Sequence, residues 1–179
     1  MHQITKSASC FTCRSCCKFK EEDRYIGPVL SHEELQTILR IYPKIDTKHF
    51  EPLNEAKTAY KITLIPSPEG GYVCPLYDLE TTYCGVYKHR PLDCSLWPIM
   101  AVKTDDPNVL GIVISSRDSC PDLERASDEA MKQYTDAVLI ALAAPRYVEH
   151  FRRHPELIWT IEPDWMIPIG TIRLSPEAE

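Results

Sequence analysis

Eight cysteines carry the clearest chemical signal in this chain of 179 residues. They make up about 4.5% of the residues, below the roughly 8–10% of a short secreted disulfide scaffold. Four of them fall within eight residues as C-x2-C-x2-C-C, and the other four are widely spaced. Such short loops rarely close internal disulfides, because the bridge geometry is narrow, but they readily wrap a metal. The predicted metal ligands are Cys10, Cys13, Cys16, Cys17, Cys74, Cys84, Cys94 and Cys120.

Two metal chemistries fit these cysteines. Iron–sulfur clusters take four cysteines, and a C-x2-C-x2-C run with a remote fourth cysteine is typical of ferredoxins. Cys10, Cys13 and Cys16 supply such a run, and any of the four spaced cysteines would be the remote ligand. Zinc usually takes two C-x2-4-C pairs, and no C-x2-C pair occurs outside the N-terminal run. The pattern favours a 4Fe–4S cluster, with Zn²⁺ as the alternative.

The number of metal centres stays open at this point. Cys16 and Cys17 are adjacent, and neighbouring side chains of an extended segment point in opposite directions, so we expect their sulfurs to face different sites. Eight thiols allow two four-cysteine centres, or one centre with additional thiols. A spaced cysteine can also serve as a small buried apolar side chain.

Two side chains between the spaced cysteines are candidate cofactor-binding residues. Arg90 offers rigid donors that would stabilise an anionic thiolate cluster or bind a substrate carboxylate; alternatively it pairs with Asp78 or Asp93. Tyr87 would donate its hydroxyl to a cluster sulfur, or else serve as a core aromatic.

The composition argues against several classes of function. Lys and Arg number 20 against 26 Asp and Glu, a net charge of −6, and affinity for phosphates requires the basic residues, so we expect no nucleic-acid binding. The longest stretch without a charged residue is 107–116, whereas a membrane-spanning helix needs about 20 residues. The first nine residues lack an apolar signal region, so we expect a cytoplasmic protein. No glycine-rich nucleotide loop occurs, which disfavours a standard Rossmann methyltransferase.

The elements that position the first cysteines are short. Ser31-x-x-Glu34 predicts a capping box, followed by an apolar helix face that Pro43 ends. We expect residues 44–58 to be irregular. Alternation and a Pro/Gly-rich turn predict one hairpin from residues 60–65 and 72–76.

The later elements show stronger patterns. We expect, in chain order, a short helix at 90–94, a hairpin of strands 97–103 and 109–115, and helices at 131–142 and 145–154. The tail contains Trp159 and Trp165 and is apolar enough to dock or to form an edge strand.

These patterns together predict an α+β fold: a small metal-stabilised, cysteine-rich domain with short β-hairpins and a C-terminal helical segment. We expect a disordered lead over residues 1–9, a cysteine-cluster metal-binding domain over 10–125, and a C-terminal helix and tail over 126–179 packed on it. Because the metal would tie loops of weak secondary structure, we expect metal binding to be coupled to folding.

The cysteine motifs resemble a known family. C-x2-C-x2-C-C is followed by Cys-Pro, then C-x-V-Y-x2-R-P-x2-C-x3-P, and a later Cys-Pro. This combination resembles the CxxCxxCC, or YkgJ-like, cysteine-cluster family of zinc- or iron-chelating domains over roughly residues 10–125. The chain departs from the family pattern at Leu76, at Ser95 and at residues 122–124.

The resemblance implies a metal centre, with iron–sulfur chemistry favoured. Relatives of the family include flagellin lysine N-methylases, which look like iron–sulfur enzymes that use S-adenosylmethionine. The resemblance therefore also implies a redox or S-adenosylmethionine-dependent role in modifying a protein, with a protein partner or substrate. The alternative is a zinc-stabilised structural or protein-interaction module without catalysis, and the sequence leaves open whether the chain is an enzyme.

Overall fold

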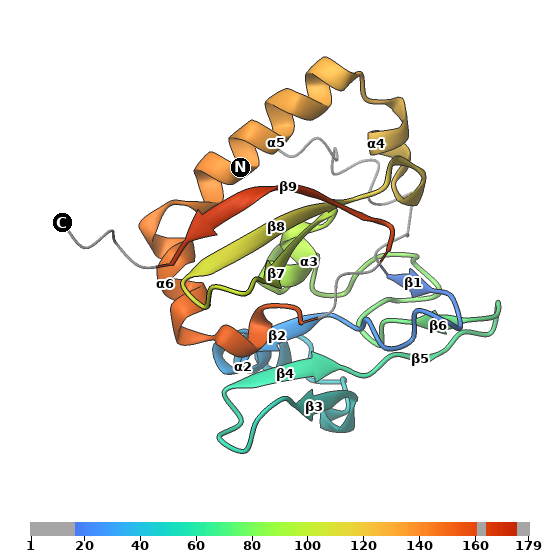
Figure 1. Cartoon of the computed structure of the whole chain (residues 1–179). Helices are drawn as coiled ribbons and strands as arrows, with labels where there is room; N and C mark the ends of the chain where they lie inside the picture. Colours follow the sequence, from blue (N-terminus) through green and yellow to red (C-terminus); the bar gives the residue numbers. More distant parts are fainter. Residues whose placement is uncertain (1–16, 161–163, 175–179) are drawn as a thin grey trace. The chain divides into compact units, whose positions relative to one another are not determined.

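The computed structural model describes residues 17–160 and 164–174 (Figure 1). Helices and small antiparallel sheets confirm the predicted α+β class. The chain divides into two compact units, and the boundary between them lies between Trp97 and Pro98. We call residues 14–97 the cysteine unit and the described residues from 98 onward the C-terminal unit. Residues 1–9, the predicted lead, lie outside the described residues, and the predicted domain boundaries stay predictions.

The cysteine unit contains two three-stranded sheets with antiparallel pairing throughout. One sheet has the order β1 (Lys18–Phe19), β6 (Tyr72–Val73) and β5 (Ile65–Pro66). The other has the order β2 (Val29–Ser31), β4 (Ala59–Ile62) and β3 (Phe50–Pro52). A 3₁₀ turn η1 (Thr47–His49) precedes β3.

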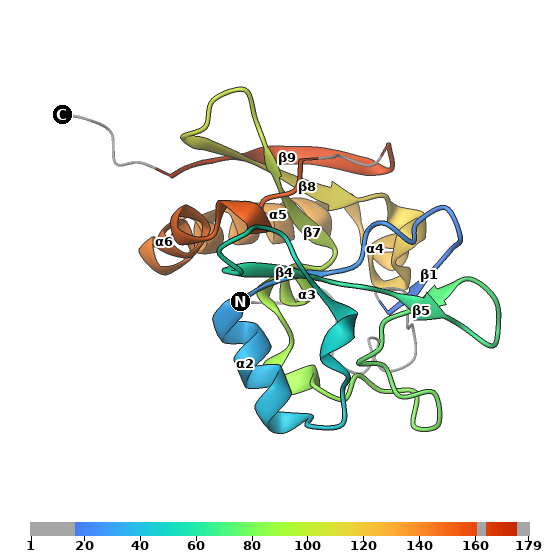
Figure 2. The same cartoon turned by 90° about the horizontal axis from the view of Figure 1, so that it is seen from below.

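The predicted first helix is confirmed as α2 (His32–Ile41). Ser31 is its N-cap and forms the complete capping box with Glu34, which satisfies backbone N–H groups that the helix start leaves unpaired. Apolar residues on one face are buried, and the helix packs against β2 and β4 (Figure 2). The helix ends at the C-cap Tyr42, next to Pro43, as predicted.

The hairpin predicted from residues 60–65 and 72–76 is wrong in its first strand. β4 pairs with β2 on one side and β3 on the other, and only the two residues of β5 pair with β6. β3 lies in the segment that we expected to be irregular. An alternating pattern indicates a strand but does not identify its partner, which non-local hydrogen bonds decide here.

The last segment of the cysteine unit carries two of the spaced cysteines. An isolated antiparallel bridge joins Tyr77 to Cys84, and a 3₁₀ turn η2 (Tyr87–His89) follows. The short helix expected here is confirmed as α3 (Leu92–Leu96), with Pro91 as its N-cap.

The C-terminal unit is built on one antiparallel sheet of order β7-β8-β9. β7 (Ile99–Lys103) and β8 (Val109–Ser115) confirm the second predicted hairpin, and the tail forms the edge strand β9 (Met166–Arg173). The remaining elements are η3 (Arg117–Ser119), α4 (Pro121–Arg125), α5 (Asp128–Leu142), α6 (Pro145–Arg153) and η4 (Pro155–Leu157). The two predicted C-terminal helices are thereby confirmed.

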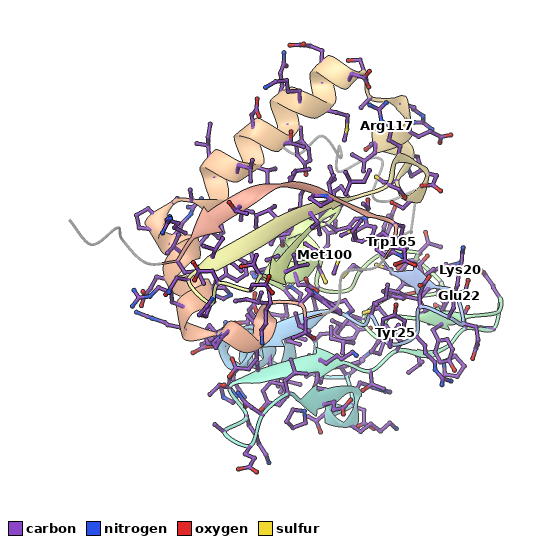
Figure 3. The ribbon with its side chains drawn as sticks, in the orientation of Figure 1. Lys20, Glu22, Tyr25, Met100, Arg117 and Trp165 are labelled. Atoms are coloured by element: carbon purple, nitrogen blue, oxygen red, sulfur yellow. The ribbon has the colours of Figure 1, made fainter. Side chains whose placement is uncertain are left out.

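Apolar side chains on both sides of this sheet stabilise the C-terminal unit. Met100, labelled with Trp165 in Figure 3, belongs to a buried cluster with Val113 and Met166, and Trp165 packs against it. α5 lies across β9 (Figure 1) and buries its predicted apolar face. No helix among residues 17–160 and 164–174 has the length and apolar character needed to cross a membrane.

Candidate metal centre

Cys17 and Cys74 face each other across the first sheet of the cysteine unit. Cys17 directly precedes β1 and Cys74 directly follows β6, and these strands pair with Lys18 opposite Val73. The Cys74 N–H donates to the Cys17 carbonyl oxygen at 3.0 Å, which adds one rung to this ladder. Opposite residues of an antiparallel pair project from the same face, with Cβ atoms about 4.5–5.5 Å apart. The fold therefore brings a cysteine of the N-terminal run beside a cysteine 57 positions away.

Cys84 sits beside Tyr77 in a second short ladder. The Gly85 N–H donates to the Leu76 carbonyl at 2.8 Å, and the Asp78 N–H donates to the Tyr83 carbonyl at 2.9 Å. These two bonds flank the Tyr77–Cys84 bridge, so the two residues form a non-hydrogen-bonded pair, the arrangement in which opposite side chains lie closest.

A tight turn connects the two ladders. The Tyr77 N–H donates to the Cys74 carbonyl at 2.9 Å, so the chain reverses over Cys74-Pro75-Leu76-Tyr77. Cys74 and Tyr77 belong to one buried apolar cluster, and Cys17 and Cys84 pack against it half-buried. Water is therefore excluded from Cys74 and only in part from Cys17 and Cys84, and a less polar environment strengthens electrostatic interactions with a bound ligand.

Helix α2 holds the two segments that carry Cys84 and Cys94. At its start, Glu34 Oε1 accepts the backbone N–H of Leu92, the first residue of α3, at 2.7 Å. At its end, the Tyr42 ring packs so closely on Gly85 that a Cβ there would lie 2.8 Å from a ring carbon. One helix of ten residues thus fixes both cysteine-bearing segments.

Cys94 lies half-buried on α3, and the neighbouring Asp93 strengthens the attachment of this helix. Asp93 Oδ2 accepts the backbone N–H of Val29 in β2 at 3.1 Å, so that side-chain to backbone hydrogen bonds tie α3 both to β2 and, through Glu34, to α2. Five residues are too few for a stable isolated helix, and these bonds supply the tertiary support that α3 needs.

The structure places Arg90 on the ring of Tyr87. The guanidinium carbon lies 4.6 Å from the ring centroid, a cation–π contact, and Nε donates to Ser95 Oγ at 3.3 Å. Within the described ranges, no carboxylate forms an ion pair with Arg90. The alternative partners are engaged elsewhere: Asp93 accepts from Val29, and Asp78 accepts the N–H groups of residues 80 and 81, which lower its pKa.

Cys120 belongs to the C-terminal unit, where it is buried as the N-cap of α4. Tyr134 on α5 is also buried, and burial raises the pKa of its hydroxyl to about 12, with a smaller contribution from the negative charge of the Cys120 thiolate.

Tyr77 is a candidate site residue that the sequence reasoning missed. Its side chain is 8% exposed, and its hydroxyl has no hydrogen-bond partner among the residues that the structure describes. Buried tyrosine hydroxyls usually find a partner. The signal in the sequence is the position of this aromatic residue, three places after Cys74.

The described residues fit a thiolate-bound metal in part. Cys17 and Cys74 share one face, their surroundings are apolar, and an unpaired buried hydroxyl lies one turn away. Among residues 17–160 and 164–174, however, no three Cys, His, Asp or Glu side chains are grouped to hold a metal ion. Cys10, Cys13 and Cys16 lie outside the described residues, so the eight-cysteine ligand set stays a prediction.

Comparison with known proteins identifies one family. Residues 9–121 match the model of the CxxCxxCC family, described as "Putative zinc- or iron-chelating domain". The match covers 113 of the 179 residues and includes all eight cysteines. No solved structure matches the chain.

Proposed function

The chain belongs to the CxxCxxCC family of zinc- or iron-chelating domains, and from this premise we propose that the metal it binds is a 4Fe–4S cluster. The observation that carries the proposal is the Cys17–Cys74 rung. It places Cys17, which directly follows the C-x2-C-x2-C run, beside the remote Cys74, and a 4Fe–4S cluster takes four cysteine ligands. We assign these two cysteines to one centre, with its two remaining ligands from Cys10 and Cys13, since Cys16 is expected to face a different site.

Two features of the cysteine unit suit an anionic cluster. Apolar side chains pack around Cys74, and the Arg90 guanidinium stacks on Tyr87 without a carboxylate counter-ion in the part of the chain that the structure describes. A positive charge held in this way would offset the charge of iron-bound thiolates, and hydrogen bonds and charges around a cluster set its reduction potential. Arg90 and Tyr87 therefore remain our candidates for residues that tune or bind the cofactor.

A 4Fe–4S cluster supplies one-electron transfer and, where one iron lacks a cysteine ligand, a place for S-adenosylmethionine. We propose such a redox or methyl-transfer role towards a protein partner, in the reducing cytoplasm, where thiols persist. The loop between Tyr77 and Cys84 supports a partner-facing role, because Leu79 and Tyr83 are 44% and 48% exposed. Calorimetry with the metal-loaded protein tests whether S-adenosylmethionine binds. If no heat of binding is measured, the proposed methyl-transfer role is wrong.

The decisive experiment measures iron, zinc and acid-labile sulfide after anaerobic purification. We expect about four irons with matching sulfide per chain, or about eight if two clusters form. Zinc without sulfide would contradict the proposal and favour the zinc-stabilised structural module.

Matched variants test the ligand assignment. Cys17→Ala and Cys74→Ala should each lower the iron content. Val73→Ala shortens a buried side chain in β6, next to Cys74, without removing a sulfur, and so serves as the control. Equal loss of iron in Val73→Ala would show that the cysteine variants act through the fold and not through ligation.

A further inference from the structure

The hydroxyl of Tyr77 is a buried donor without an acceptor. The side chain is more than nine-tenths buried, and no atom of the described residues accepts from or donates to its oxygen. Leaving such a group unpaired is costly, and native structures do so rarely, usually where a ligand, ion or water completes the bond.

The hydroxyl lies within the cysteine-bearing part of the fold. Tyr77 is the non-hydrogen-bonded partner of Cys84, so the phenol ring and the Cys84 thiol project from the same face at the closest cross-strand spacing. Its backbone N–H bonds to Cys74, whose own N–H bonds to Cys17. A continuous path of backbone contacts thus connects Tyr77 to three predicted metal ligands.

The cysteines of this neighbourhood suggest which kind of acceptor the hydroxyl would meet. Tyrosine offers one O–H donor, and a metal centre held by thiolates presents negatively charged sulfurs that accept hydrogen bonds. The bridge to Cys84 places the Tyr77 side chain on the same face as this predicted ligand.

We propose that Tyr77 is a positioning residue of the metal centre, whose hydroxyl donates a hydrogen bond to a metal-bound sulfur, either a cysteine thiolate or an inorganic sulfide. This inference rests on the metal binding argued above. It assigns to Tyr77 the role that the sequence suggested for Tyr87, because Tyr77 is the residue with a buried, unpaired hydroxyl among the cysteine ladders.

Tyr60 provides a matched control within the same apolar cluster. It is also 8% exposed, but its hydroxyl lies 3.4 Å from His32 Nδ1 and so has a partner within the fold. The Tyr60→Phe and Tyr77→Phe variants therefore remove the same atom at the same depth of burial and differ in what that atom contacts.

The test measures metal affinity and stability of both variants beside the wild-type chain. Zn²⁺ affinity is measured by competition with a chromophoric chelator, and iron and sulfide reconstitution gives the reduction potential. Tyr77→Phe should weaken metal affinity by roughly 10- to 100-fold, the usual effect of losing an outer hydrogen bond to a metal ligand, and should lower the potential. Tyr60→Phe should change neither. Without metal, Tyr77→Phe should melt no lower than wild type.

Each outcome decides a different point. Wild-type metal binding with unchanged affinity and potential in Tyr77→Phe overturns the role of Tyr77 and leaves the metal function intact. A Tyr77→Phe chain that melts lower without metal, or fails to fold, shows that the hydroxyl serves the fold itself and overturns the inference as well. A wild-type chain that holds neither zinc nor iron removes the proposed function and this inference together.

Discussion

Glu34 joins the start of helix α2 to Leu92, the first residue of the helix that carries Cys94. Its Oε1 accepts the Leu92 N–H at 2.7 Å, while its Oε2 accepts the Ser31 N–H, also at 2.7 Å. One carboxylate thus closes a local capping box and a contact across 58 positions of sequence. The N-terminal ends of α2 and α3 each leave backbone N–H groups without a partner inside the helix, and the Glu34 side chain accepts one such hydrogen bond at each end.

Glu34→Gln should lower the free energy of unfolding by about 1–3 kcal/mol. The glutamine amide keeps one acceptor oxygen but turns an NH₂ group towards the other N–H donor, so one of the two bonds is lost. Urea denaturation checks this value. Glu33→Gln removes an equal charge from the same helix turn at an exposed position and serves as the control. Equal losses in both variants would mean that charge at the helix start, and not the double hydrogen bond, is responsible.

Gly71→Ala should disturb the ladder that brings Cys17 and Cys74 together. Gly71 has φ +67°, and a Cβ there would lie 2.4 Å from the backbone oxygen of Phe19, the last residue of β1. Backbone atoms cannot yield as a flexible side chain would, so we expect a loss of about 1–3 kcal/mol in stability, with weaker metal binding.

Gly70→Ala is the control for this clash. Gly70 also has positive φ, at +93°, but its Cβ would meet nothing within 4 Å. Both variants carry the strain of a positive φ, so the difference between their melting temperatures reports the clash of the Gly71→Ala methyl group with β1 alone. If both variants melt at the same temperature and bind metal equally well, the close approach of Gly71 to β1 does not hold the Cys17–Cys74 rung.

Gly85→Ala should loosen the segment that carries Cys84. The added methyl group would meet the Tyr42 ring, and overpacking of this kind costs about 1–3 kcal/mol. Tyr42→Leu removes the ring carbons concerned, so Gly85→Ala should cost less in the Tyr42→Leu background than in the wild type. A double-mutant cycle of unfolding free energies measures this coupling, and strictly additive effects would contradict the proposed contact.

The free energy of unfolding should fall at high pH because the buried Tyr134 resists ionisation in the folded state. Burial, followed by the charge of Cys120, raises the pKa of its hydroxyl from 10.0 to about 12 in the folded state. Below pH 10 the neutral phenol is present in both folded and unfolded chains, and its contribution is complete. As the pH rises from about 10 to 12, the unfolded chain ionises first, so stability falls by about 1.4 kcal/mol per pH unit over this window.

Unfolding free energies of Tyr134→Phe across this pH window test the effect. The variant should lose less stability between pH 10 and 12 than the wild type, by about 2–3 kcal/mol in total. Tyr25→Phe, which removes an exposed phenol, gives the background change. Parallel curves for wild type and Tyr134→Phe would show that Tyr134 does not contribute to alkaline unfolding.

The sequence by itself determined the features that depend on near neighbours along the chain. The capping box of Ser31 and Glu34, the end of α2 before Pro43, the β7–β8 hairpin and the apolar face of α5 each follow from patterns spanning a few residues. The cysteine spacing likewise identified the family, because residue types and their spacing are read directly from the chain without knowing how it folds.

Only the tertiary structure decided which distant segments meet. β1, β5 and β6 have two residues each, too few positions for an alternating pattern to specify a partner or a register. The Cys17–Cys74 rung, the second bond of Glu34 and the unpaired hydroxyl of Tyr77 all depend on hydrogen bonds between residues far apart in sequence or on the packing around them. Such contacts form only once the chain has folded, and for that reason the spacing of residues predicts the chemistry of this site but not its arrangement.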